Sequence, residues 1–281
     1  MSEFTCNICG KDCREAECPS CRATVRDRAI LQVLSMELFG VNLTLPEFPR
    51  LKSLRGLGTS DSYVYAGRLA DKFDYRNTFY DRAPQLDIAN PPEEEFGKYD
   101  FLISSEVFEH VLPPVEHAFH NACRLLKPNG ILVLTTPYSL EATTAEHFPE
   151  LHQFGFAEVG DRLVVVNRTR SGELQMFENP IFHLGCSGRA LEVREFSESA
   201  LKALLAEAGF PAIRIYSENY APFGIVRAES WSLPMAARKG TFTLGPDATR
   251  EVMEHWRDLN RDVRKWSRSY WFRAGWKLKL L

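Results

Sequence analysis

Short apolar runs alternate along the chain with amphipathic stretches of helical spacing. Residues 101–103 and 131–135 are apolar runs of the length expected for buried parallel strands. Between them, apolar residues recur at helical intervals from 115 to 126. A strand, a crossover helix and a second strand form the basic unit of a parallel sheet. The pattern therefore predicts an α/β fold with this unit at its centre.

The pattern predicts further elements on both sides of this unit. The clearest is a helix that Ser197 is suited to cap and Gly209 to end. This capped helix covers 197–208. In chain order, the other expected elements are a helix at 26–39, a strand at 51–55, a helix at 63–73, a short strand at 77–81, a hairpin at 163–167 and 173–177 and a strand at 212–216.

The composition narrows the class of protein. With 44% hydrophobic residues, a chain of 281 residues is long enough for one α/β core and a smaller attachment, and it is not a disordered protein. A net charge of −3 argues against whole-surface binding of nucleic acid, which usually needs a basic surface. No apolar run is long enough to span a bilayer, and the polar, cysteine-bearing start does not resemble a signal peptide. We therefore expect a cytoplasmic protein.

Five of the seven cysteines lie within the first 21 residues. Four of them form two CxxC pairs, and two such pairs complete a tetrahedral site of four thiolates that is typical of zinc. The expected ligands are Cys6, Cys9, Cys18 and Cys21. Cys13 is a fifth thiol that could replace one of them, and a metal-free reduced tail is the alternative. Four thiolates leave no open coordination position, so a zinc ion here is expected to be structural.

A pair of glycines lies between the strand at 51–55 and the helix that follows it. Gly56 and Gly58 let a ligand approach the backbone, and the start of the helix offers free N–H groups. Ser60 and Asp61 come next, and either could simply cap the helix. Because Asp61 takes the place of the third glycine of a dinucleotide fingerprint, binding of NAD is disfavoured.

Acidic residues follow the next apolar runs. Asp81 lies roughly twenty residues beyond the glycines, the separation at which an acid binds ribose hydroxyls in dinucleotide sites. Asp87 precedes Ile88, and a carboxylate beside an apolar side chain suits an adenine, with a loop cap as the equal alternative. Ser105 and Glu106 follow the central strand, at the edge where open α/β sheets bind ligands.

His110 is a candidate general base, because it lies within about one helical turn of Glu106 and histidine titrates near neutral pH. A role in orienting the loop or in packing is the alternative. The histidine- and acid-rich stretch at 141–156 is interpreted as part of a substrate cap. Its two histidines and two acids also suit a metal ion, but their spacing matches no known pattern.

The succession of motifs resembles the class I S-adenosylmethionine-dependent methyltransferases, especially the broad type 11 group. The motifs are LRGLGTSD, NTFYD, LDIANPP, YDFLISSEVFEHV and LLKPNGILVLTTPY, of which EVFEHV followed by LKPNG is the most specific. The similar stretch covers residues 51–210. The resemblance implies S-adenosylmethionine as cofactor and a doubly wound, mostly parallel sheet of seven strands. That Rossmann-like sheet would end in an antiparallel hairpin with its last strand near 225–229.

The same resemblance implies roles for the candidate residues. They are Gly56 and Gly58 at the methionine portion of the cofactor, Asp81 at the ribose, Asp87 and Ile88 at the adenine, and Ser105 and Glu106 on the sulfonium side. The family commonly has a third glycine where this chain has Ser60. Residues 145–154 also resemble loosely the Glu-His tract of sugar C-methyltransferases that carry an N-terminal zinc module. By that likeness, His147 is a candidate base that removes the acceptor proton.

The expected activity is methyl transfer by in-line displacement, in which the protein mainly holds donor and acceptor at near-attack distance. The acidic balance and the long cap favour a small-molecule or glycan acceptor over nucleic acid. One alternative is a non-catalytic binding or scaffold protein that keeps the fold. Another is a protein or nucleic-acid methyltransferase that docks through the zinc module.

The C-terminal tail interleaves tryptophans with arginines and lysines. A basic aromatic helix of this kind suits contact with an anionic membrane surface or a protein partner, and packing onto the core is the alternative. The chain is thus divided into a zinc module with its linking helix (1–45), a cofactor-binding half (46–138), a cap insertion (139–195), the closing helix and strands (196–240) and the basic aromatic tail (241–281).

Overall fold

A six-stranded mixed sheet forms the centre of the protein, in a computed structural model that describes residues 3–185, 188–229 and 231–267. The strand order is β15-β16-β6-β5-β3-β4. The parallel part consists of β6 (Leu126–Thr135), β5 (Tyr99–Ser105), β3 (Leu51–Thr59) and β4 (Phe73–Thr78). β15 (Ala212–Ile215) and β16 (Met235–Arg238) add an antiparallel hairpin next to β6. The doubly wound fold with a terminal hairpin is confirmed, and the sheet has six described strands instead of seven.

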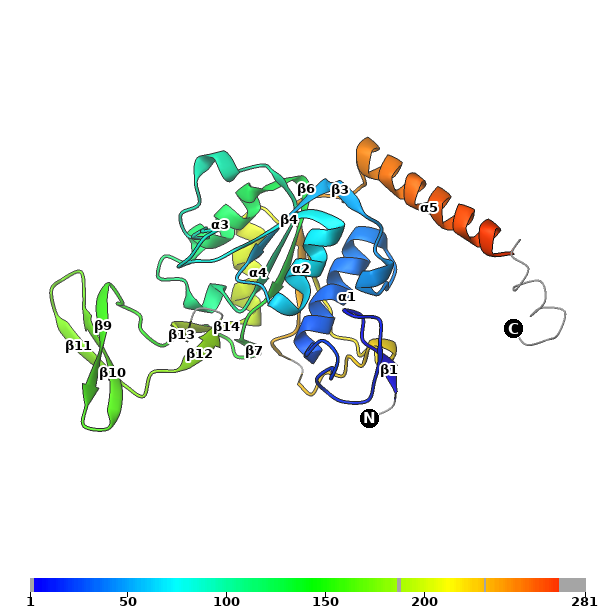
Figure 1. The fold of residues 1–281 in the computed structure, drawn as a ribbon. Helices are drawn as coiled ribbons and strands as arrows, with labels where there is room; N and C mark the ends of the chain where they lie inside the picture. Colours follow the sequence, from blue (N-terminus) through cyan, green and yellow to red (C-terminus); the bar gives the residue numbers. More distant parts are fainter. Residues whose placement is uncertain (1–2, 186–187, 230, 268–281) are drawn as a thin grey trace.

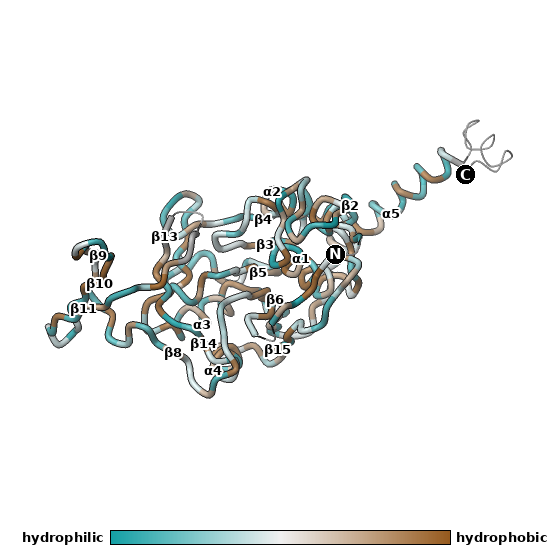
Figure 2. Tube along the Cα trace, turned by 90° about the horizontal axis from the view of Figure 1, so that it is seen from below, coloured by the Kyte–Doolittle hydropathy of each residue, from teal (hydrophilic) through white to brown (hydrophobic). Residues whose placement is uncertain are grey.

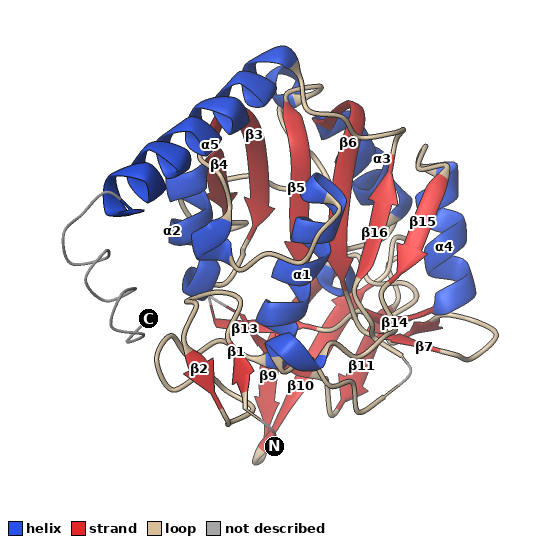
Figure 3. Ribbon diagram, turned by 90° about the vertical axis from the view of Figure 1, so that its right-hand side faces the viewer, coloured by secondary structure: helices blue, strands red, loops and turns tan. Residues whose placement is uncertain are grey.

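Helices cover both faces of this sheet (Figure 3). The helices α1 (Val25–Phe39) and α2 (Tyr63–Lys72) lie on one face, and α3 (Glu116–Leu125) and α4 (Glu198–Glu207) lie on the other. Alternate residues of a strand point to opposite faces. In β5, Phe101 and Ile103 therefore belong to the core under α1 and α2, whereas Leu102 belongs to the core under α3 and α4.

The helices predicted on either side of the sheet are confirmed to within two residues at each end, but three strand predictions need correction. β3 continues four residues beyond position 55 and takes in both glycines. The strand predicted at 77–81 is β4, which ends at Thr78, because its buried residues alternate from Phe73 through Tyr75. The last strand is β16 and not 225–229, since only the Met235–Ala237 part of this region is continuously buried against β6.

The N-terminal cysteine module packs against the core under α1. It contains the two-stranded pair of β1 (Phe4–Thr5) and β2 (Asp12–Cys13). Buried cysteines of this module belong to the same apolar cluster as Phe101 of the central sheet. Thr24 caps α1 through a reciprocal pair of contacts with Asp27. The module and the sheet therefore share one continuous core.

The insertion between β6 and α4 carries a small sheet of its own. β9 (Gln153–Val159), β10 (Arg162–Arg168) and β11 (Leu174–Glu178) form three antiparallel strands that stand away from the central sheet (Figure 1). The predicted hairpin is confirmed as β10 and β11, and β9 adds a strand that the sequence did not indicate. The other strands of this region are β7 (Tyr138–Ser139), β8 (Ala145–Glu146), β12 (Phe182–Gly185), β13 (Gly188–Leu191) and β14 (Arg194–Ser197).

The long helix α5 (Pro246–Ser267) extends away from the body of the protein (Figures 1 and 3), and polar and hydrophobic turns alternate along it (Figure 2). Its exposed apolar residues are Met253, Trp256, Leu259, Val263 and Trp266. The rest of the basic tail, residues 268–281, lies outside the described residues. None of the described helices combines the length and the apolar character needed to cross a bilayer. Contact of this tail with a membrane or a partner stays a prediction.

Four short 3-10 turns complete the list of described helical elements. They are η1 (Leu45–Glu47), η2 (Glu93–Glu95), η3 (Phe108–His110) and η4 (Ala221–Phe223). The turn η3 begins three residues after the end of β5, so that it holds the candidate His110 at the sheet edge where the parallel strands end.

Candidate functional site

Polar side chains meet at the carboxyl edge of the parallel strands. The hydroxyl of Thr59, at the end of β3, donates to the Ser104 hydroxyl at 2.9 Å. The hydroxyls of Ser105 and Thr135 lie 2.8 Å apart, and the Glu106 N–H donates to the Thr135 carbonyl at 2.8 Å. The predicted residues Ser105 and Glu106 are therefore fixed beside the end of β6, at the edge where open α/β sheets bind ligands.

Two neighbouring strands end in residues with a left-handed backbone. Ser60 follows β3 with φ of 58°, and Glu106 follows β5 with φ of 55°. Non-glycine residues seldom adopt this conformation, and such residues cluster at functional sites. Ser60 stands where the resembling family commonly has glycine, so the serine adopts a backbone conformation that glycine adopts without strain. The helix cap expected of Ser60 or Asp61 is provided instead by Ser62, which accepts from the Val64 N–H.

Substitutions at Ser60 are expected to differ in how well they tolerate the left-handed backbone. Ser60→Gly should leave the free energy of unfolding within about 1 kcal/mol of the parent, because relief of strain offsets the added flexibility of the unfolded chain. Ser60→Val should lower it by about 1–3 kcal/mol, because a β-branched side chain clashes in this conformation. Urea unfolding of both variants measures the difference. Equal stabilities of the two variants would contradict the assigned backbone conformation.

The glycines of β3 are required by close contacts with aromatic side chains. A Cβ on Gly56 would lie 2.2 Å from the Phe101 ring, and a Cβ on Gly58 would lie 2.2 Å from the Tyr75 hydroxyl. These glycines therefore let aromatic residues pack directly on the strand that leads to the site. A structural demand of this kind is compatible with a ligand approaching the backbone of Gly58 at the strand end.

The Asp61 carboxyl group is buried below the loop that follows β3. The hydroxyls of Tyr75 and Tyr65 both donate to it, and its side chain is 2% exposed. Burial raises its pKa to about 8, although the two tyrosine hydrogen bonds act in the opposite direction. The Asn77 amide also bonds both backbone groups of Asp61. Asp61 therefore holds the loop in place from below.

The predicted ribose and adenine residues lie on the next segment of the same edge. Asp81 follows β4 and is exposed. Asp87 accepts from the Ala89 N–H at 2.9 Å, as expected for a loop cap, and Ile88 is buried. The amide of Asn121 on α3 donates to the carbonyls of Ile88 and Ala89. The loop that carries the predicted adenine contacts is thus tied to the body of the fold.

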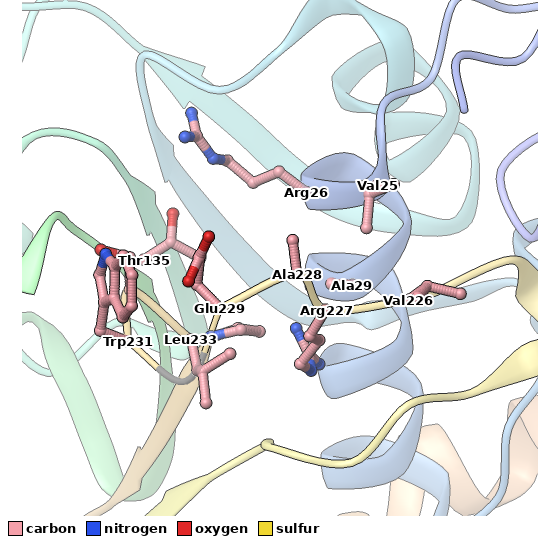
Figure 4. A pocket seen from close by; sticks show the side chains of 12 residues that line it. Val25, Arg26, Ala29, Thr135, Val226, Arg227, Ala228, Glu229, Trp231 and Leu233 are labelled. Atoms are coloured by element: carbon pink, nitrogen blue, oxygen red, sulfur yellow. The ribbon is translucent and has the colours of Figure 1, made fainter.

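A cavity of about 220 Å³ opens beside this edge, between α1 and the segment before β16 (Figure 4). Arg26 lies on the α1 side, and Thr135, Glu229 and Trp231 lie together on the other. The Arg26 guanidinium also pairs with Glu106 at 3.3 Å. Nothing in the sequence pattern linked the cysteine module to this edge, because the contact joins residues eighty positions apart.

The histidine candidates lie on the loops that border the same edge. Glu109 is fully buried and accepts from the Thr136 hydroxyl at 2.9 Å. Its other oxygen lies 3.6 Å from Nε2 of His110, whose Nδ1 lies 2.8 Å from the Leu191 carbonyl. His110 is thus held between Glu109 and the backbone, which fits the orienting role that the sequence left open.

His147 forms a close pair with Glu192, which sequence reasoning missed. Its Nε2 lies 2.9 Å from the Glu192 carboxylate, and Glu192 is only 7% exposed. Backbone hydrogen bonds join this pair to the central site. The His147 N–H donates to the Val193 carbonyl, and the Val193 N–H donates to the backbone carbonyl of Glu109. A buried carboxylate fixes the orientation of an imidazole ring.

Arg194 is a second residue that no sequence pattern singles out. Its side chain is 1% exposed, and Nε donates to Glu146 at 2.7 Å. Nη1 donates to the Val111 carbonyl at 2.5 Å, in the loop that follows His110. Arg194 therefore joins the insertion to the loop after β5, and only a long-range contact reveals this role.

The four predicted cysteine ligands converge in the N-terminal module. The sulfur atoms of Cys6, Cys9, Cys18 and Cys21 all lie within 4.8 Å of one another. The Cys6–Cys21 and Cys9–Cys18 sulfur pairs are each 3.7 Å apart. Four thiolates at the usual Zn–S distance of about 2.3 Å in a tetrahedron have sulfurs about 3.8 Å apart, so the cluster fits a metal ion. Cys13 lies outside the group and bonds the Glu15 carbonyl.

Without an ion, the thiols of Cys6 and Cys18 differ in their acidity. Burial raises the pKa of Cys6 to about 11. In Cys18 burial acts in the same direction, but hydrogen bonds from the Cys21 and Ser20 backbone outweigh it and lower its pKa to about 7. Because metal ligands must be thiolates, binding of an ion releases protons from this cluster.

Comparison with known proteins identifies solved structures that are similar to this chain. The CurJ carbon methyltransferase matches with 14% identity and a TM-score of 0.41, covering 70% of this chain and 51% of that chain. This chain thus spans about half the length of that protein. The sugar N-methyltransferase KedS8 from Streptoalloteichus sp ATCC 53650 matches with 13% identity and a TM-score of 0.42, covering 74% and 85%. No curated protein matches the chain.

A family model described as a methyltransferase domain matches residues 66–214, which is more than half of the chain. The match begins within α2 and ends in β15, so it includes the edge at which β5 and β6 end. The chain therefore belongs to the methyltransferase-domain family.

Proposed function

We propose that the protein transfers a methyl group from S-adenosylmethionine to a small-molecule or glycan acceptor held in the cavity beside Glu106. The observation that carries this proposal is the position of the cavity. Two of its lining residues, Arg26 and Thr135, contact Glu106 and Ser105, the residues proposed for the sulfonium side. The bound cofactor supplies an electrophilic methyl carbon at that place.

The proposed cofactor site follows the carboxyl edge from β5 to β4. We assign the sulfonium side to Ser105 and Glu106, and the methionine portion to the backbone at Gly56, Gly58 and Ser60, with Asp61 supporting that loop from below. Asp81 is assigned to the ribose hydroxyls, and Asp87 with Ile88 to the adenine. The strands that carry these residues are neighbours in the sheet, so the residues follow one another in space.

The lining of the cavity supports an acceptor that combines an apolar surface with polar groups. Trp231, Val25 and Leu233 offer apolar area, and Glu229 offers a carboxylate that accepts from hydroxyl or amino groups. Arg26 offers donors on the opposite wall. A cavity of about 220 Å³ suits a small acceptor or one sugar ring better than a base within a nucleic acid.

We propose His147 as the base for an acceptor that loses a proton, on the evidence of its pairing with Glu192; His147 lies on the insertion and is not one of the residues that line the cavity. With its Nε2 proton directed at Glu192, the other ring nitrogen accepts the acceptor proton, and the carboxylate stabilises the resulting imidazolium. When bound, the cofactor would supply the methyl group that the acceptor takes up, and His147 would hold the proton that the acceptor loses. In this assignment His110 has a positioning role, because both of its ring nitrogens face Glu109 or Leu191.

We further propose that the cysteine cluster binds one structural zinc ion. The spacing of the sulfurs and the absence of an open position in a four-thiolate site support this assignment. The division into module, cofactor half, cap insertion, closing elements and tail is proposed with the boundaries given above. The cofactor half and the module share a core, so these segments are units of function and not separate folding units.

The cofactor site is tested by titrating the purified protein with S-adenosylmethionine in a calorimeter. We expect the parent chain to bind and Asp81→Ala to bind about 10- to 100-fold more weakly, because a hydrogen bond to a charged group contributes about 1.5–3 kcal/mol. Asp71→Ala is the matched control, since Asp71 is an exposed acid on α2 away from the sheet edge.

The outcomes of this titration are distinct. Weaker binding by Asp81→Ala with normal binding by Asp71→Ala supports the assigned ribose contact. Equal affinity of the parent and both variants would remove Asp81 from the site. No binding by the parent chain would overturn the proposed cofactor site and favour the non-catalytic alternative.

A further inference from the structure

We propose that the cysteine module holds both walls of the acceptor cavity in place, with Arg28 as the positioning residue, so that metal binding orders the acceptor side of the enzyme. That the cavity holds the acceptor rests on the proposed function, but the coupling between the module and the cavity does not. The inference assigns the module an internal role in the active site, in place of docking to a partner.

The first wall is the start of α1, which follows the second cysteine pair directly. Cys21 and Val25 are four positions apart, and Val25, Arg26 and Ala29 line the cavity. The Cys18 N–H donates to the Ala23 carbonyl, so the second cysteine turn fixes the residue that precedes the helix cap. A change in the cysteine turn therefore moves the beginning of this wall.

The second wall consists of residues 226–229 and 231–234, and Arg28 holds the residue that leads into it. This side chain is fully buried, and its guanidinium donates to Ala23 at 2.9 Å, to Ala16 at 3.0 Å and to Gly224 at 3.2 Å. Two of these carbonyls belong to the cysteine module, and the third lies two residues before the second wall. Arg28 thus connects the cysteine module to the residue that leads into the second wall, 196 positions further along the sequence.

Close packing strengthens this connection. The Arg28 guanidinium lies over the Phe4 ring at 4.8 Å from its centre. The same ring contacts Gly224, where an added Cβ would lie 2.6 Å from it. Gly224 also has φ of 61°, a conformation that favours glycine. Gly224, two residues before the second wall, therefore approaches the module so closely that a shift of Phe4 or Arg28 must displace it.

The first wall also acts on the charge at the edge of the sheet. Arg26 pairs with Glu106, which follows β5 in a strained backbone conformation. Among the described residues, the acidic side chains near the start of α1 also include Asp27, which is engaged by the Thr24 cap. Arg26 thus links the start of α1 to the Glu106 carboxylate on the proposed sulfonium side.

Hydrogen exchange measured by mass spectrometry tests the coupling. The zinc-loaded protein is compared with protein treated with a strong chelator, in peptides from 24–31, 224–234 and the central strands β5 and β6. We expect exchange in 24–31 and 224–234 to rise at least about 10-fold more than in β5 and β6 after metal removal. Exchange that rises only within residues 3–23 would overturn the proposal, and so would a uniform rise in all peptides.

Substitution of Arg28 provides a second test of the coupling between the module and the cavity. In Arg28→Met, we expect metal content to be kept and exchange to rise in 224–234, whereas Arg28→Lys, which retains donors for the three carbonyls, should restore part of the protection. The matched control is Arg14→Met, because Arg14 lies in the same module but is exposed and pairs with Glu3. Normal protection of 224–234 in Arg28→Met would also overturn the proposal.

A titration with S-adenosylmethionine on the same samples keeps the two proposals apart. We expect Arg28→Met to bind the cofactor within about 3-fold of the parent, because Arg28 contacts none of the assigned cofactor residues. Failure of the parent to bind the cofactor would overturn the proposed function without touching the coupling. Cofactor affinity lost on metal removal, with unchanged exchange in 224–234, would overturn the coupling alone.

Discussion

Cys9→Ser is expected to abolish stoichiometric zinc binding and to destabilise the protein. The sulfur atoms of Cys9 and Cys18 lie 3.7 Å apart within a cluster that fits four zinc–thiolate bonds. A serine hydroxyl does not replace a thiolate ligand. Apparent binding free energies of structural zinc reach about 10–16 kcal/mol in small modules, so we expect a loss of at least about 3 kcal/mol in the free energy of unfolding. Metal analysis of the purified protein and thermal unfolding measure the two effects.

Cys13→Ser is the matched control for this prediction. It removes a thiol from the same module, but the Cys13 sulfur donates to the Glu15 carbonyl and lies outside the four-cysteine group. We expect one zinc ion per chain in Cys13→Ser and a melting temperature within about 3 °C of the parent. Loss of zinc from Cys13→Ser, or its retention in Cys9→Ser, would mean that the ligand set is wrong.

The destabilisation should be felt beyond the module because of where the cysteines are buried. Cys6 and Cys18 are 0% exposed and share an apolar cluster with Phe101 and Val133 on the sheet face under α1. If the module folded separately from the rest of the protein, loss of the ion would disrupt the structure of the module only. Here, loss of the ion should also lower the unfolding temperature of the central sheet.

The elements with periodic side-chain patterns were predictable from the sequence. The stripe of α1 and the capped helix α4 repeat at helical spacing, and both are found to within two residues. The extent of β3 was not predictable, because Gly56 and Gly58 carry no side chain that could show a strand pattern. Only the rings of Phe101 and Tyr75, which come from neighbouring strands, explain why glycine is needed there.

For the site, the sequence indicated residue types but not their partners. Spacing was sufficient for the cysteine cluster, because both CxxC pairs are local and close on a short loop. The pair of His147 and Glu192 joins residues 45 positions apart, and Arg28 reaches Gly224 across 196 positions. Contacts of that range depend on how the whole chain folds, so no local pattern signals them.

Asp61 gives the second large effect, a dependence of stability on pH. Burial raises its pKa to about 8, whereas the unfolded residue titrates near the ordinary value of 3.8. Between these two values the folded protein keeps a proton that the unfolded chain has released, so stability falls as the pH rises through this window. One pKa unit corresponds to about 1.4 kcal/mol, so this group alone changes the free energy of unfolding by up to about 6 kcal/mol across the whole window.

Asp61→Asn removes this titration and keeps an oxygen that accepts from Tyr75 or Tyr65. Urea unfolding of parent and variant between pH 5 and pH 8.5 is the measurement, and the difference in free energy between the two proteins isolates Asp61 from other groups. We expect the variant to gain stability relative to the parent as the pH rises. Asp71→Asn, an exposed acid on α2, should track the parent at every pH.

The direction of this effect decides what Asp61 does in the cofactor loop. A carboxyl that is protonated near neutral pH is a neutral support for the Ser60 backbone, held by two tyrosines and shielded from solvent. If parent and Asp61→Asn instead show the same pH dependence, Asp61 is ionised throughout the window. A buried anion directly below the loop would then favour the positive sulfonium side of the cofactor, and Asp61 would act on the ligand by its charge as well as by its position.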